Sequence, residues 1–174
     1  NVIQSLINNS KGSASLTKQT ETNDVVFGLA FVSDKAGAID KIRAYTGQER
    51  EYQAYLWKKT GSSWSQVYLT TITTQNATTF SGEKDINWPI EKDVQYRIGI
   101  RLKKPTIGDG SVIRLNSSSN NITNGEAKIG SLTFEKTFYY KIHYYGASQA
   151  TALPEDVGTY AHFAGMLDFD FLAE

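Results

Sequence analysis

The chain has 174 residues, of which 18 are basic, 18 are acidic and 40% are hydrophobic. This length suits one domain that folds without a metal or disulfide, so we expect a single domain over residues 1–174. The balanced charge gives no net field that would attract nucleic acid, and we expect no nucleic-acid partner. Cysteine is absent, which excludes disulfides, thiolate nucleophiles and Cys-based zinc sites.

No apolar run is long enough to cross a bilayer, so we expect no membrane span in this chain. A chain that starts at Asn1 rather than Met is expected to be processed or trimmed. A signal peptide, lipid anchor or further domain removed in that way would leave no trace.

The predicted elements begin with a short helix and continue as strands. Residues 1–9 (NVIQSLINN) are compatible with a short helix, and VVFGLAFV from Val25 has the β-branched and aromatic content of a strand. Turn clusters such as SDKAG separate such runs at the spacing of an antiparallel sandwich. No helical pattern of crossover length lies between the runs, which disfavours a parallel sheet.

The stretch YQAYLWKKTGSSWSQVYL predicts a strand, a turn and a second strand. Alternation along the first strand gives two rows of side chains. One row holds Tyr52, Ala54 and Leu56, and the other holds Gln53, Tyr55, Trp57 and Lys59. A small residue beside Leu56 suits a crowded interior, so we expect Tyr55 and Trp57 to be exposed or to lie under a loop. Trp64, just past the turn, either covers a loop or contacts a ligand.

The strands QVYLTTITT from Gln66 and VQYRIGIRLKK from Val94 follow, and the second has the clearest alternation. Its apolar row is Tyr96, Ile98, Ile100 and Leu102, and its basic row is Arg97, Arg101 and Lys103. We expect the first row to be buried and the second to face water. Trp88 is flanked by Ile86 and Ile90, and we expect it in the core.

The aromatic segment TFYYKIHYYG, residues 137–146, is predicted to be a strand with two unequal faces. Phe138, Tyr140, Ile142 and Tyr144 form one row, and Tyr139, Lys141, His143 and Tyr145 form the other. Only one face of a strand can touch the core of a two-layer sandwich, and burying lysine and histidine is the costlier choice. We therefore expect Tyr139, His143 and Tyr145 to face outward.

The chain then makes a long excursion over residues 146–165, with a short helix expected near Pro154. A last strand is expected over residues 166–172 (MLDFDFL), with Asp168 and Asp170 facing solvent. The predicted fold is an all-β, antiparallel, jelly-roll-like sandwich with one or two short helices in loops. Its core is expected to span about residues 25–145.

Few residues carry a signature of catalysis. His143 and His162 are the only histidines, and neither has the spacing of a metal site or a catalytic triad. A glycoside hydrolase needs two carboxylates across a cleft, and no such pair stands out. We predict no catalytic residue, no metal-ligating residue and no cofactor. A structural calcium is compatible with loop oxygens at residues 109–112 (DGSV) or 150–158 (ATALPEDVG).

One set of motifs resembles a known kind of module. GLAFVSDKAGAIDKIRAY, AYLWKKTGSSW and WPIEKDVQYRIGI occur in this order between Val25 and Lys104. The sequence there resembles a family of secreted bacterial β-sandwich modules of unknown function, jelly-roll-like and similar to galactose-binding-type domains. The matching positions are Phe31, Gly37, Ile39, Ile42, Arg43, Tyr45, Leu56, Trp57 and Gly61. The resemblance implies an accessory module at a cell surface or in a secreted polysaccharide-processing system, and it transfers no catalytic residue to this chain.

The leading hypothesis is a non-catalytic binding module for carbohydrate, because sugar C–H faces stack on aromatic rings while their hydroxyls need polar partners. The predicted ligand contacts are Tyr55, Trp57, Tyr139, His143 and Tyr145. The alternative is a structural or protein-interaction domain of a bacterial surface assembly, in which the same rings form an interface with a surface protein. A third hypothesis, a glycan-active enzyme, requires two facing carboxylates in a cleft.

Overall fold

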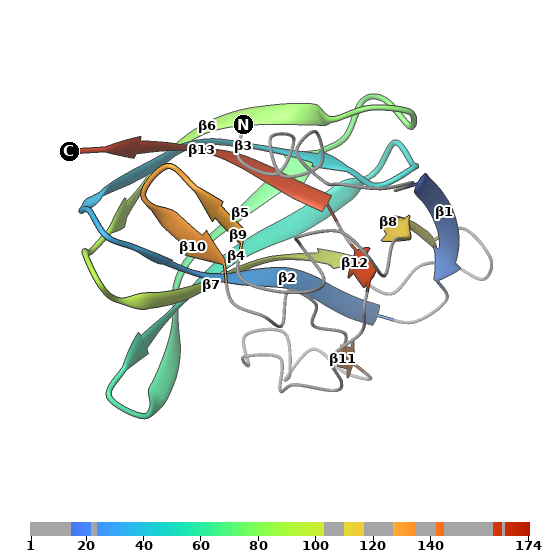
Figure 1. The fold of residues 1–174 in the computed structure, drawn as a ribbon. Coiled ribbons are helices and arrows are strands. Elements are labelled where there is room, and N and C mark those ends of the chain that lie inside the picture. The colour runs from blue at the N-terminus through green and yellow to red at the C-terminus, as the bar shows by residue number, and fades with distance from the viewer. Residues whose placement is uncertain are drawn as a thin grey trace.

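The computed structural model describes residues 15–21, 24–102, 110–116, 127–134, 142–144, 162–164 and 166–174, and these form strands and turns with no helix. Its strands pair antiparallel throughout (Figure 1). They are β1 (Ser15–Glu21), β2 (Asp24–Ser33), β3 (Gly37–Tyr45), β4 (Glu51–Thr60), β5 (Ser63–Thr73), β6 (Ser81–Ile90), β7 (Gln95–Leu102), β8 (Gly110–Asn116), β9 (Ala127–Ile129), β10 (Leu132–Phe134), β11 (Ile142–Tyr144), β12 (His162–Ala164) and β13 (Met166–Ala173). Within these ranges, no helix has the length and apolarity needed to cross a membrane.

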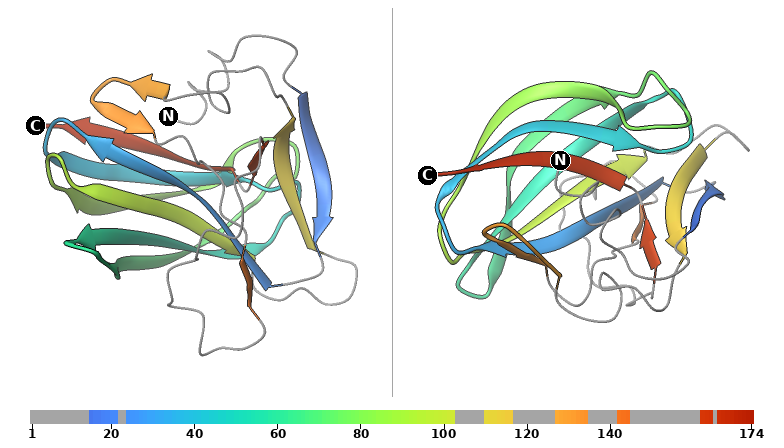
Figure 2. Two further views of the ribbon diagram at one scale, coloured as in Figure 1. Left: turned by 60° about the horizontal axis from the view of Figure 1, so that its bottom comes forward. Right: turned by 45° about the horizontal axis from the view of Figure 1, so that its top comes forward.

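The strands belong to three sheets. The largest has the order β5-β4-β7-β2-β10-β9, with β11 paired to β2, and the second has the order β13-β3-β6. These two sheets face each other as the layers of a sandwich, while β1, β8 and β12 form a small sheet at one end (Figure 2). The predicted all-β antiparallel sandwich is confirmed, and its jelly-roll connectivity stays a prediction.

The core fills the space between the large sheet and the β13-β3-β6 sheet. Alternate side chains from both sheets point into it and are buried. Phe31 of β2 joins the layers, since its ring lies 5.8 Å from that of Tyr96 and 5.6 Å from that of Phe169 on the opposite sheet. Burying each such ring contributes about 1.5–3 kcal/mol. Trp88 is buried here, as predicted.

Both faces of the middle strands are buried, which the sequence analysis did not predict. In β4, Ala54 and Leu56 point into the core as expected, yet Tyr55 and Trp57 are only 1% and 2% exposed. In β7, Arg101 is 4% exposed, so the expectation that its row faces water is wrong at this position. The Arg101 guanidinium donates to Oε1 of Gln53, 3.2 Å away, which lowers the cost of its burial.

The outer face of the β13-β3-β6 sheet corrects a second prediction. The last strand forms as expected and pairs with β3, but Asp168 is buried rather than solvent-facing. Its carboxylate lies 2.9 Å from the guanidinium of Arg43, and Asp170 lies 2.8 Å from the same group. An ion pair of this kind offsets part of the free-energy cost of burying a carboxylate.

Several predicted segments fall outside the described residues. These are the two short helices, the residues of the aromatic segment other than 142–144, and most of the excursion over residues 146–165. One part of that excursion is described: residues 162–164 form β12 and pair with β8. The excursion therefore ends in a short strand that the sequence analysis did not predict.

Candidate functional site

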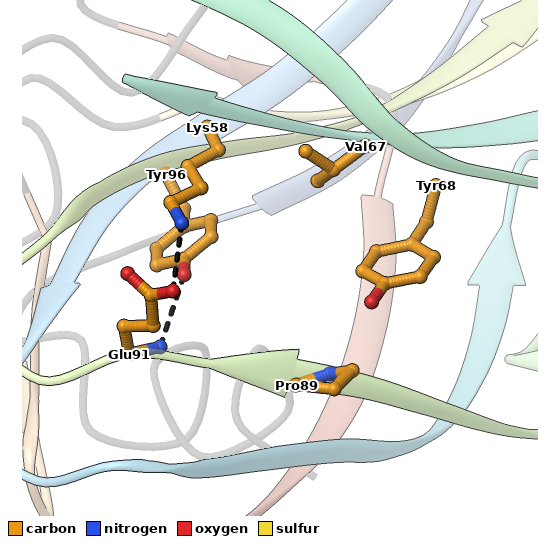
Figure 3. A pocket seen from close by; sticks show the side chains of 6 residues that line it. All are labelled: Lys58, Val67, Tyr68, Pro89, Glu91 and Tyr96. Carbon is orange, nitrogen blue, oxygen red and sulfur yellow. Dashed lines mark hydrogen bonds and ion pairs between the residues drawn. The ribbon is translucent and has the colours of Figure 1, made fainter. Parts of the chain in front are cut away.

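A pocket of about 110 Å³ opens at one edge of the sandwich. β5 is the last strand of the large sheet and β6 is the last strand of the opposite sheet, so the pocket lies where two sheet edges face each other (Figure 3). The side chains that line it come from β4, β5, β7 and the end of β6. They are Lys58, Val67, Tyr68, Pro89, Glu91 and Tyr96.

The backbone at the rim of the pocket departs from regular strand pairing. Leu56 pairs with Tyr68 but the next residue, Trp57, pairs with Gln66, so Val67 is the extra residue of a bulge in β5. Val67 lies at the rim and is 37% exposed. On the facing strand, Pro89 is tolerated because an edge strand does not need every backbone N–H for its ladder.

The rings of two tyrosines form much of the pocket wall. Tyr68 packs flat against Trp88, with ring centroids 5.8 Å apart and planes 11° from parallel. Figure 3 shows Tyr68 reaching from β5 toward β6, and Tyr96 on the other side of the pocket. Because Trp88 belongs to the core, this stack holds the Tyr68 ring in one orientation at the rim.

The polar groups of the pocket gather at its other end. Nζ of Lys58 lies 2.8 Å from Oε1 of Glu91, an ion pair that joins the two sheets. The backbone N–H of Glu91 donates to the hydroxyl of Tyr96 over 3.0 Å. The hydrogen bond to Glu91 raises the pKa of Lys58, and burial raises the pKa of Tyr96. Lysine therefore stays charged and tyrosine stays neutral at physiological pH.

This arrangement suits recognition of a small polar ligand with an apolar face. The tyrosine rings, Val67 and Pro89 provide apolar surface, while Lys58 is a donor and Glu91 an acceptor. The volume is well below the roughly 300–1,000 Å³ of pockets that enclose a drug-sized ligand. The pocket therefore has room for one unit of a ligand whose remainder stays outside.

A second aromatic cluster lies on the outer face of the same hairpin. The rings of Tyr55 and Trp57 stack 5.2 Å apart, and the Tyr55 hydroxyl donates to Oε1 of Gln53 over 2.7 Å. Nearer the hairpin tip, the guanidinium carbon of Arg97 lies 4.4 Å from the centre of the half-buried Trp64 ring. Such cation–π contacts contribute about 0.5–2 kcal/mol and hold the ring in place.

The predicted contact residues therefore do not form one described surface. Tyr55 and Trp57 lie side by side but are buried, which excludes the exposed alternative for both. Tyr139 and Tyr145 lie outside the described residues, and His143 lies in β11 opposite Val25 with its side chain likewise outside them. Whether these five residues contact a ligand stays a prediction.

The expected calcium segments are largely beyond the described ranges, since only residues 110–112 of them lie in a strand. Across the side chains that are described, no group of three or more histidine or acidic residues has the geometry of a metal site. The described residues do not test whether these loops bind calcium.

The sequence analysis missed the pocket residues, and it had no signal for them. Lys58 of β4 and Glu91 just after β6 stand 33 positions apart, and neither is among the matching positions of the quoted motifs. Their meeting depends on how the edges of two sheets approach. A proline within a run of strand-forming residues, as at Pro89, suggests an edge strand but not a pocket.

Comparisons with known proteins add no identification. No protein-family model matches this sequence, and no curated protein matches it either. The resemblance to secreted bacterial β-sandwich modules stays a prediction.

Proposed function

We propose that this chain is a non-catalytic carbohydrate-binding module that acts outside the cell or at its surface. The pocket at the sandwich edge carries the proposal. Its tyrosine rings offer flat apolar surface for sugar C–H groups, and its Lys58–Glu91 pair offers a donor and an acceptor for sugar hydroxyls. Recognition of sugars requires both kinds of surface close together.

The absence of a second acidic side chain from the described pocket lining supports binding rather than hydrolysis. Glu91 is the carboxylate among the six lining residues, and its partner is Lys58. Hydrolysis of a glycosidic bond by the common mechanisms uses two carboxylates about 5–9.5 Å apart. A single carboxylate held by a lysine suits a hydrogen-bonding role.

Burial of Tyr55 and Trp57 moves the proposed first contact away from them. A ligand reaches rings that are 1% and 2% exposed only after the surrounding chain has moved. We therefore place the first contact at the pocket, and Tyr139, His143 and Tyr145 remain proposed further contacts.

Affinity electrophoresis through gels that contain different polysaccharides tests the proposal. Tyr68→Ala removes the ring of the pocket wall, and Leu69→Ala changes the next residue, which is 46% exposed on the same strand. We expect at least one polymer to retard the unaltered protein, Tyr68→Ala to migrate freely, and Leu69→Ala to be retarded. Thermal melting of both variants verifies that they are folded. Free migration of the unaltered protein through every gel would contradict the proposal.

A protein-interaction role is the second candidate, and the exposed edge of β5 favours it. Val67 and Leu69 are 37% and 46% exposed, and β5 has no strand beyond it among the described residues. Exposed apolar side chains on an edge strand are a common site of contact with another chain. Light scattering tests this role: an oligomer that Leu69→Lys dissociates favours it, and a monomer at high concentration counts against it.

A further inference from the structure

The ion pair between Lys58 and Glu91 is the feature of the pocket that bears on which ligand it accepts. Nζ and Oε1 are 2.8 Å apart, and the side chains are 26% and 61% exposed. The lysine belongs to β4 and the glutamate directly follows β6, so the pair spans both sheets at the pocket. Figure 3 shows both side chains converging at one end of it, beside Tyr96.

Hydrogen-bonding capacity remains at this end of the pocket after the pair has formed. A lysine ammonium has three N–H donors and a carboxylate has two acceptor oxygens, and this contact uses one of each. The Tyr96 hydroxyl accepts from the N–H of Glu91 and carries its own proton. A hydroxyl group matches this set, since it accepts from the ammonium while it donates to the carboxylate.

Charged ligands match the pair less well. A ligand carboxylate beside Lys58 would also lie beside Glu91, and a ligand amine beside Glu91 would lie beside Lys58. Either ligand would be repelled by the like charge or would have to replace one partner of an existing pair. A neutral ligand leaves the pair intact.

We propose that the pocket selects a single uncharged sugar unit, held by its hydroxyls at Lys58 and Glu91 and by its C–H face at Tyr68. This inference rests on the proposed function and specifies its ligand class. Size supports it, because about 110 Å³ leaves room for one unit at most. Neutral polysaccharides are therefore the ligands, and polymers of uronic acids or of amino sugars with free amines are not.

Affinity electrophoresis with neutral polymers (galactomannan, xyloglucan, mixed-linkage glucan), with polygalacturonate and with chitosan tests this selectivity. We expect retardation by at least one neutral polymer and by neither charged polymer. Lys58→Met should weaken retention by the neutral polymer at least about tenfold, the usual effect of losing a hydrogen bond to a charged group. Glu91→Gln should weaken it less, because its amide oxygen still accepts a hydrogen bond but carries no charge. Lys59→Met is the matched control, because it removes the same charge at the adjacent position of β4, and it should retain binding.

Glu91→Gln gives a sharper signature, because it leaves the Lys58 charge in place without its carboxylate. This variant should gain retention by polygalacturonate, which Lys58→Met should not. Stronger retention of the unaltered protein by polygalacturonate than by any neutral polymer would overturn the inference. Equal effects of Lys58→Met and Lys59→Met would also overturn it.

The failure of the inference differs from the failure of the proposed function. Suppose that a neutral polymer retards the unaltered protein, that Tyr68→Ala abolishes this retardation, and that Lys58→Met and Glu91→Gln change nothing. Carbohydrate binding is then supported, and the role of the ion pair is contradicted. If no neutral or charged polymer retards the unaltered protein, the proposed function and the inference are both contradicted.

Discussion

Replacing Arg43 tests how the last strand is held to the sandwich. The Arg43 guanidinium on β3 lies 2.9 Å from the carboxylate of Asp168 and 2.8 Å from that of Asp170, both on β13. It also lies 3.2 Å from Glu83 on β6, so one side chain joins all three strands of this sheet. Arg43 is 13% exposed and Asp168 1% exposed, which places their contact in a poorly solvated environment.

The expected magnitude follows from that burial. Arg43→Met keeps much of the aliphatic volume but removes the cation beside a buried carboxylate, a change that costs about 3–5 kcal/mol in the free energy of unfolding. For a chain of this length the loss corresponds to a fall in melting temperature of about 6–20 °C. The contact with Glu83 adds little, because this carboxylate is 54% exposed.

Lys41→Met is the matched control for this experiment. It removes a cation from the same strand, but Lys41 is 38% exposed and lies 3.6 Å from Asp85, which is 84% exposed. We expect a change of at most about 0.5–1 kcal/mol. Urea unfolding followed by tryptophan fluorescence measures both variants. Equal losses for Arg43→Met and Lys41→Met would refute the reasoning that burial of Asp168 makes the Arg43 contact strong.

Other predictions concern acid stability and two glycines. The hydrogen bond from Arg43 lowers the pKa of Asp170 from 3.8 to about 2, so its stabilising effect is present above pH 4 and is lost as the pH falls toward 2. Between pH 5 and pH 2.5 the free energy of unfolding should fall by about 1 kcal/mol more in the unaltered protein than in Asp170→Asn, after discounting for partial exposure. A loss of equal size in Asp170→Asn would contradict this. Gly82→Ala should destabilise more than Gly61→Ala, because both have positive φ (68° and 64°) but only at Gly82 would the new Cβ lie 2.6 Å from a backbone oxygen of β5. Equal melting temperatures for the two glycine variants would show that the clash is relieved.

Side-chain alternation predicted the inner rows of the sandwich well. In β7, Tyr96, Ile98 and Ile100 are all at most 2% exposed, as their spacing implied. A core-facing row requires an apolar residue at every second position, and this pattern can be recognised from a short stretch of sequence. The same reasoning placed Ala54 and Leu56 of β4 in the interior.

Alternation could not predict what happens on the outer rows. It identifies which side chains share a face but not whether that face is covered, and the premise of one wet face per strand is wrong for Tyr55, Trp57 and Arg101. Asp168 was misassigned for a related reason. Arg43, whose guanidinium donates to the buried Asp168 carboxylate, is 125 positions away in the chain. Pairing over such a distance leaves no local pattern in the sequence.

The candidate site was even less accessible to sequence reasoning. The pocket lies where the edge strand β5, which bulges at Val67, faces the edge of the other sheet. Neither the bulge nor the approach of the two sheets follows from composition or periodicity. The hairpin is rich in aromatic residues and includes Tyr68, but nothing in the sequence indicates that Tyr68 and Tyr96 lie on opposite sides of a pocket.

The most direct test of carbohydrate recognition at the sandwich edge is a titration followed by two-dimensional ¹H–¹⁵N NMR. The ligand is an oligosaccharide prepared from whichever neutral polymer retards the protein. The account predicts that the largest chemical-shift changes fall on the amides of Val67, Tyr68 and Glu91. The N–H of Glu91 is the group that donates to the Tyr96 hydroxyl. Shift changes confined to the outer face of the β13-β3-β6 sheet, or none at saturating oligosaccharide, would contradict it.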